Sequence, residues 1–146
     1  MGLARVTEAA EESGRPDIRK KTAGFLNRLL EAMIRLQCAD GRFHDILDDP
    51  ASFVDGTSSL MMAATVFRGI LHGYVSKSYF DAAETAYRTV SKKADGMGLI
   101  HEVCGCPDFI SEGTSAEAQA AFVMADTWRE KLAATIGQSE KCAGQF

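Results

Sequence analysis

The sequence predicts an all-α fold, built as a double-layered array of α/α hairpins. The first observation behind this prediction is an internal repeat, because the segment 41–58 reappears 57 residues later as 98–115. Each copy reads Gly, any residue, an aromatic or aliphatic residue, His, an acid and an aliphatic residue, and then continues through Pro to acid-Gly-Thr-Ser. The second observation is that helical segments with one apolar side alternate with segments that are apolar all round. A repeat period of tens of residues is typical of stacked helical units.

Five helices are expected in chain order. The first is short and ends at Ser13-Gly14, because a glycine often closes a helix and Pro16 cannot continue it. The second and fourth have apolar residues at spacings of three and four, with charged residues between them, so they should form an outer, amphipathic layer. The third and fifth are apolar on every side and should form an inner layer with the first. The expected helices lie near residues 3–12, 17–37, 58–73, 79–93 and 115–134.

Capping side chains are expected at three of the helix starts. Thr57 or Ser58 is placed to cap the third helix. Ser78, with Asp81 three residues later, resembles a capping box for the fourth helix, and Thr114-Ser115-Ala116-Glu117 resembles another for the fifth.

Three further side chains are interpreted as structural. Asp55 and Glu112 precede the third and fifth helices, where the helix dipole stabilises a carboxylate. Trp128 lies late in the fifth helix and is expected in the core.

The composition argues against several classes of partner and cofactor. The net charge of -4 comes without a basic stripe, so no nucleic-acid partner is expected. No apolar run is long enough to span a bilayer, and the N-terminus lacks the apolar segment of a secretory signal. We therefore expect no membrane partner and a cytoplasmic location. Cys104 and Cys106 are separated by one residue, where zinc sites use two to four, so no metal or other cofactor is expected. The four thiols, which include Cys38 and Cys142, are interpreted as structural or incidental.

Several stretches of the chain match the motifs of one known family. They include Met1-Gly2-Leu3-Ala4-Arg5-Val6, Asp40-Gly41-Arg42-Phe43-His44, Ile46-Leu47-Asp48-Asp49-Pro50 and Glu112-Gly113-Thr114-Ser115-Ala116-Glu117. In these stretches the chain resembles the unsaturated glucuronyl and rhamnogalacturonyl hydrolases, which are six-hairpin (α/α)6-barrel glycosidases of glycoside hydrolase families 88 and 105. The resemblance implies a partial (α/α)6 toroid, with residues 1–146 forming one partial barrel domain of about two and a half hairpins. It also implies that the family's catalytic carboxylates belong to earlier hairpins, so the catalytic residues are unknown.

Four residues of the repeated loops are candidates for substrate binding: His44, Asp45, His101 and Glu102. Imidazole donates and accepts hydrogen bonds and titrates near neutrality, which suits sugar hydroxyls or a uronate. The structural alternative is that each ring bonds its own loop and caps the neighbouring repeat, and repetition itself favours this alternative. The acids of these wet loops should be ionised, whereas a general acid at neutral pH needs a raised pKa.

The resemblance leads to an expected function with two alternatives. The chain is expected to be the C-terminal portion of a glycoside hydrolase for unsaturated uronyl, rhamnogalacturonan-type oligosaccharides, and to be inactive alone. It is alternatively a non-catalytic carbohydrate-binding remnant, or a helical-repeat scaffold that binds another protein. The expected partners are an oligosaccharide, and either a second copy of the chain or a missing N-terminal half, because an open arc leaves apolar flanks exposed.

Overall fold

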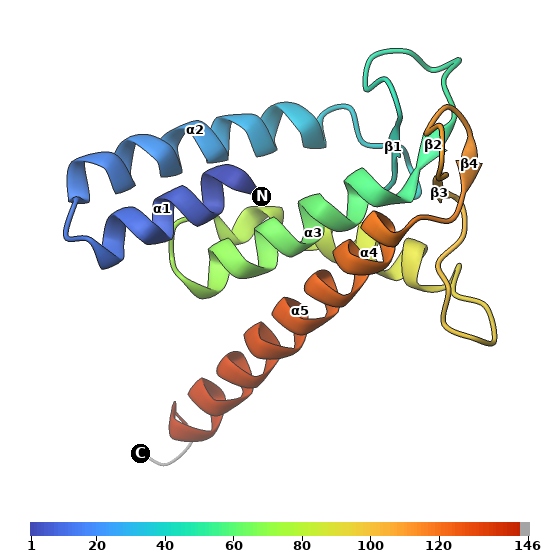
Figure 1. Ribbon diagram of the computed structural model, residues 1–146. Coiled ribbons are helices and arrows are strands. Elements are labelled where there is room, and N and C mark those ends of the chain that lie inside the picture. The colour runs from blue at the N-terminus through green and yellow to red at the C-terminus, as the bar shows by residue number, and fades with distance from the viewer. Residues whose placement is uncertain (144–146) are drawn as a thin grey trace.

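The computed structural model describes residues 1–143, with side chains described through residue 137 (Figure 1). Five α-helices and one 3-10 turn make up most of the described chain, which confirms the predicted all-α class. Each predicted helix is present within a few residues of its expected limits, except that the last runs about nine residues further. Their bounds are α1 Gly2–Glu12, α2 Pro16–Ile34, α3 Gly56–Leu71, η1 Lys77–Tyr79, α4 Phe80–Ser91 and α5 Ala116–Ala143.

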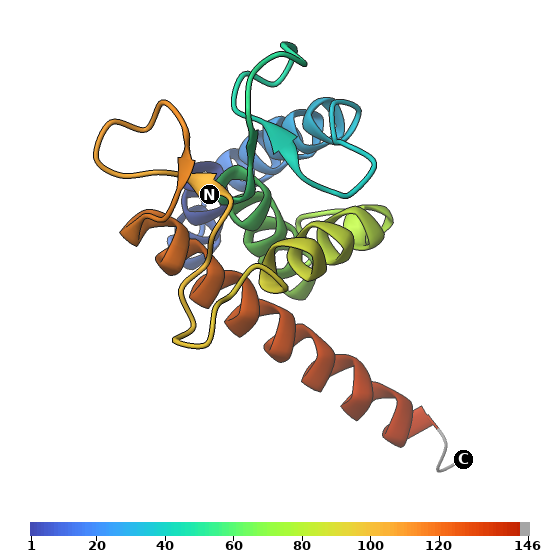
Figure 2. The same ribbon diagram turned by 90° about the vertical axis from the view of Figure 1, so that its right-hand side faces the viewer.

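Helix α3 is the centre of the fold. It packs against α4 on one side and α5 on another, while α1 packs against α2 (Figures 1 and 2). All but four residues of α3 are buried, the exceptions being Ser58, Met61, Arg68 and Leu71. The prediction that this helix is buried nearly all round is therefore confirmed.

Helix α5 differs from the prediction that the fifth helix is an inner helix like α3. The prediction of a helix that is apolar on every side is wrong, because α5 also carries Asp126, Arg129 and Glu130. It buries one stripe, made of Ala118, Ala121, Ala125 and Leu132. Val123 and Ile136 remain 61% and 47% exposed. The stripe has helical spacing and small side chains, which let α5 lie close along α3. Beside this stripe Phe122 stacks on Tyr87 of α4, with 6.0 Å between the ring centroids, so the exposed apolar side chains of α5 lie beyond the faces that α3 and α4 cover.

The caps differ from the predicted ones in two places. Asp55 caps α3, because its carboxylate accepts hydrogen bonds from the N–H groups of Thr57 at 2.7 Å and Ser58 at 2.9 Å. The predicted caps Thr57 and Ser58 are wrong because the helix begins at Gly56, before both of them. The predicted cap Ser78 is also wrong: a 3-10 turn capped by Ser76 precedes α4, so the helix begins later, at Phe80.

At the third predicted start, Ser115 caps α5. Its hydroxyl accepts a hydrogen bond from the N–H of Ala118 at 3.2 Å. Of the residues in the predicted capping box, it is Ser115 and not Thr114 that makes this bond.

The two repeated segments form hairpins on the same side of the helices (Figures 1 and 2). Strand β1 (Phe43–His44) pairs antiparallel with β2 (Val54–Asp55), and β3 (Val103–Cys104) pairs antiparallel with β4 (Glu112–Gly113). These two-residue strands were not predicted, because they are too short to show a period of two.

The two copies of the repeat are most alike in structure in the turn that precedes each hairpin. Cys38 N–H donates to the Arg42 carbonyl at 2.8 Å, and Asp95 N–H donates to the Leu99 carbonyl at 2.9 Å. Gly41 and Gly98 take φ values of +91° and +84°, which explains why both copies begin with glycine. The apolar residues that follow the turns also correspond, since Phe43 and Ile100 are both fully buried.

No described helix combines the length and the apolar composition needed to cross a bilayer.

Candidate functional site

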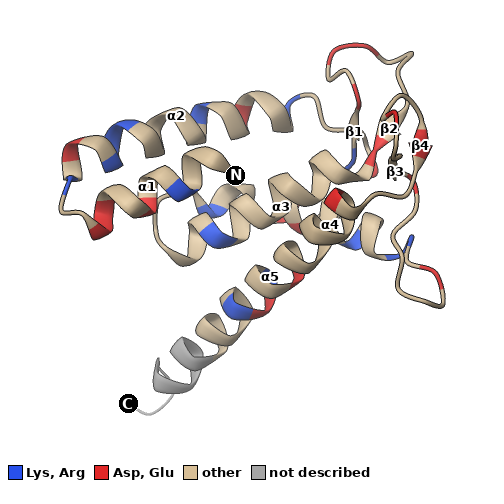
Figure 3. Cartoon of the chain, viewed as in Figure 1, with Lys and Arg blue, Asp and Glu red and all other residues tan. Residues whose placement is uncertain are grey.

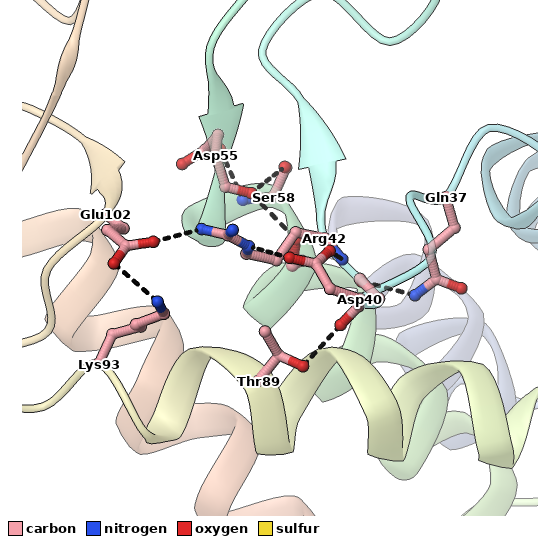
Figure 4. Close-up of polar contacts among 10 residues, drawn as sticks. Gln37, Asp40, Arg42, Asp55, Ser58, Thr89, Lys93 and Glu102 are labelled. Atoms are coloured by element: carbon pink, nitrogen blue, oxygen red, sulfur yellow. Dashed lines mark hydrogen bonds and ion pairs between the residues drawn. The ribbon is translucent and has the colours of Figure 1, made fainter.

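An ion-pair network joins the two repeated loops (Figure 4). The guanidinium of Arg42 lies 2.8 Å from Asp40 Oδ2 and 2.8 Å from Glu102 Oε2. The other Glu102 oxygen lies 2.7 Å from Nζ of Lys93, two residues after the end of α4. Arg42 is largely buried, so this network holds the first loop against the second. Sequence reasoning missed it because Arg42 and Glu102 are 60 residues apart.

The network fixes the charge of Glu102. The hydrogen bond from Lys93 lowers the pKa of Glu102, burial opposes this, and the bond from Arg42 lowers it further. Glu102 is therefore an ionised partner of two cations at neutral pH.

The two repeated histidines each bond within their own loop. His44 Nδ1 donates to the Ser52 carbonyl at 2.8 Å, which sets its tautomer. His101 Nε2 lies 3.0 Å from Asp95 Oδ2, and this contact is the first cause of the lowered pKa of Asp95. Among the described side chains no hydrogen bond joins the two rings. The links between the repeats come instead from other groups, including Arg42.

The two acids at the ends of the repeats have different positions. Asp55 is buried, and besides capping α3 it accepts a hydrogen bond from the N–H of Cys104 at 2.8 Å. Its predicted structural role is confirmed. Glu112 precedes α5 as predicted, but it is exposed on β4, and Ser115, not Glu112, caps the helix that begins at Ala116.

An open groove lies between the tips of the two loops. One wall comes from the loop between β1 and β2 and the other from the loop between β3 and β4, and Asp45 is the only one of the four predicted binding residues that lines it. The groove was not predicted, although its residues Phe53 and Ile110 are equivalent positions of the repeat. The lining residues are Asp45, Ile46, Asp49, Ala51, Ser52, Phe53, Phe109, Ile110, Ser111 and Glu112.

The groove is acidic. Asp45, Asp49 and Glu112 line it, and within residues 1–137 no Lys or Arg does. Figure 3 shows acidic residues along the loop between β1 and β2, whereas the nearby basic residue Arg42 is engaged by Asp40 and Glu102.

A second polar cluster joins the helices away from these loops. Glu8 of α1 accepts hydrogen bonds from Arg68 at 2.7 Å and from the Tyr74 hydroxyl at 2.5 Å. The Arg68 guanidinium also lies over the ring of Trp128, 4.8 Å from its centroid. Trp128 packs against the core while remaining partly exposed, in agreement with the predicted core position. The cluster connects α1, α3 and α5.

The described side chains contain no group of three or more His, Cys, Asp or Glu residues that could hold a metal ion. The contact of Cys104 is instead with the chain itself, since its thiol lies 3.3 Å from the Phe109 carbonyl. Burial, and then the charge of Asp55, raise the pKa of the Cys104 thiol. Cys142 lies outside the residues whose side chains are described.

Comparison with known proteins matches residues 1–127 to the model of Glycosyl Hydrolase Family 88. Among solved structures, a possible member of the GH105 family from Salmonella enterica serovar Paratyphi A is similar with a TM-score of 0.76 and 22% identity, over 91% of this chain and 37% of that one. A possible GH105 member from Klebsiella pneumoniae has a TM-score of 0.72 and 19% identity, over 88% and 38% of the two chains. A family 88 glycosyl hydrolase from Bacteroides vulgatus has a TM-score of 0.67 and 18% identity, over 78% and 36%. No curated protein matches the chain.

These comparisons fix the fold at the level of a partial barrel. The chain spans less than two fifths of the length of the solved structures named here. The likeness to them is therefore a likeness of fold over that portion.

Proposed function

The chain belongs to Glycosyl Hydrolase Family 88, and we propose that it supplies a sugar-binding portion of an enzyme for unsaturated uronyl, rhamnogalacturonan-type oligosaccharides, without supplying the general acid. The observation that carries this proposal is that the carboxylates of Glu102 and Asp55 are engaged by other groups of the chain. Glu102 is bound by Lys93 and Arg42, and Asp55 accepts three backbone N–H bonds. A general acid must hold its proton at neutral pH and so needs a raised pKa, whereas hydrogen bonds from Lys93 and Arg42 lower the pKa of Glu102.

The predicted binding residues divide into two roles in this proposal. Asp45 contacts the sugar directly, because it lines the groove. His44 supports the same loop through its bond to the Ser52 carbonyl. His101 and Glu102 position the second loop through their bonds to Asp95 and Lys93.

The test is an activity and binding measurement on the purified chain. Hydrolysis of an unsaturated uronyl disaccharide is followed by the loss of the sugar's ultraviolet absorbance, and binding is followed by NMR titration. We expect binding without turnover. Turnover at an enzyme's usual rate, abolished by Asp45→Asn or Glu102→Gln but not by the exposed control Asp48→Asn, would overturn the proposal.

A second proposal is association with another polypeptide through the open apolar edges. It is favoured by exposed apolar side chains on α2 and α5, among them Phe25, Leu29 and Val123. Self-association is the simplest form of this proposal.

A further inference from the structure

The walls of the groove combine apolar side chains with carboxylates. Ile46, Phe109 and Ile110 are 53%, 40% and 75% exposed, so three large apolar side chains of the groove are accessible to solvent. Phe53 adds a second aromatic ring to the lining. Ligand sites typically have such walls with a few polar groups among them.

The second loop holds Phe109 in an uncommon backbone conformation. Its φ is +58°, in the left-handed region that bulky residues rarely adopt, and its N–H donates to the Gly105 carbonyl at 2.9 Å. Strain of this kind persists where the surrounding structure fixes it, and it is concentrated at functional sites.

The charges of the groove select between classes of sugar. Its three carboxylates accept hydrogen bonds from hydroxyl groups, and such charge-assisted bonds are stronger than neutral ones. The same carboxylates repel a uronate, because like charges that approach within about 4 Å repel each other even in water. Among the described side chains no Lys or Arg lines the groove to offset this repulsion, and Arg42 and Lys93 are both paired with Glu102.

We infer that the groove between residues 45–53 and 109–112 binds an uncharged pyranose ring of an oligosaccharide and excludes a uronate. This inference rests on the proposed function and narrows it. The apolar face of the ring lies on Phe109 and its neighbours, and the ring hydroxyls donate to Asp45 and Glu112. The charged unsaturated sugar of the substrate must then be bound elsewhere.

The test compares two ligands that differ in one charge, galacturonic acid and its methyl ester. Both are titrated into the full chain, with backbone amide shifts recorded by NMR. We expect the ester to shift amides of residues 45–53 and 109–112, and the acid to bind there at least tenfold more weakly. In the double variant Asp45→Asn with Glu112→Gln, the ratio of ester affinity to acid affinity should fall severalfold. Phe109→Ala should weaken ester binding about tenfold, whereas Met97→Ala, on the exposed loop before β3, should leave it unchanged.

The outcomes separate this inference from the proposed function. Equal binding of acid and ester in the groove would overturn the inference, even if an unsaturated uronyl disaccharide still binds the chain. Binding of the ester only outside residues 45–53 and 109–112 would overturn it as well. If the chain binds neither these ligands nor the disaccharide, the proposed function fails and the inference fails with it. The acid and ester are compared on the unmodified chain, so this result does not depend on how any variant folds.

Discussion

The carboxylate of Asp55 accepts a hydrogen bond from the backbone N–H of Cys104 at 2.8 Å. Because the same carboxylate caps α3, one buried side chain fixes both the start of the central helix and the position of the second loop. The N–H of Gly56, next in the chain, donates to the Glu102 carbonyl at 3.2 Å. The two repeats are thus joined through backbone groups as well as through the Arg42–Glu102 ion pair.

Asp55→Asn should destabilise the chain by about 2 kcal/mol. An amide can accept on one oxygen only, so its NH2 group would face a backbone N–H that is left without an acceptor. For a chain of this size we expect the Tm to fall by about 5 °C, measured by circular dichroism. The matched control is Asp48→Asn in the same loop, where the side chain is exposed and the Tm should not change. Equal melting of both variants would contradict the assigned role of Asp55.

The helices could be predicted because the information for them is local. The apolar pattern of α3 and the Ser13-Gly14 stop are both readable from neighbouring residues. The end of α5 could not be predicted, because residues 135–143 lack an apolar pattern that would mark them as helical, yet the backbone stays helical to Ala143. The cap of α3 was predicted two or three residues too late, because Asp, Thr and Ser are all common capping residues at the start of a helix.

The candidate site was predicted only at the level of its loops. The repeat identified the two loops, but the contacts between them join residues from separate copies. The Arg42–Glu102 pair and the groove of Asp45 and Glu112 depend on how the two hairpins are placed, and β3 begins at Val103, beyond the position equivalent to Phe43. A sequence repeat does not encode that offset.

Two glycines in helices should respond in opposite directions to alanine. At Gly69 in α3 a Cβ would lie 2.2 Å from Val75 Cγ2, so Gly69→Ala should cost about 1–3 kcal/mol through overpacking. At Gly24 in α2 a Cβ would meet nothing within 4 Å, so Gly24→Ala should stabilise the helix by about 0.5–1 kcal/mol. Thermal unfolding checks both predictions through the change in Tm of each variant. A Gly69→Ala chain with an unchanged Tm would contradict the close contact between α3 and Val75.

Glu8 should make stability depend on pH in the acid range. Burial would raise its pKa, but hydrogen bonds from Arg68 and Tyr74 lower it below the ordinary value of 4.5. The stabilisation is therefore complete above about pH 4.5 and is lost as the pH falls through the lowered value. Glu8→Gln should lower the free energy of unfolding at pH 7 by about 1–3 kcal/mol, and its difference from the unmodified chain should shrink toward pH 3.

The control for Glu8 is Glu12→Gln, exposed at the end of the same helix. Its unfolding should follow that of the unmodified chain at every pH. A difference for Glu8→Gln that stays constant from pH 7 to pH 3 would mean that the ionised form of Glu8 contributes nothing.

The last prediction concerns self-association. Val6, Phe25 and Leu29 are about half exposed on α1 and α2, and Val123 and Ile136 are exposed on α5. Groups of exposed apolar side chains usually mark an interface. Two copies related by a two-fold axis could bury these side chains against each other. We expect light scattering after size exclusion to show a dimer whose fraction rises with protein concentration. Leu29→Asp and Val123→Asp should each shift the chain toward monomer, while Met97→Asp on an exposed loop should not. A single monomeric mass over a hundredfold range of concentration would exclude association through these edges.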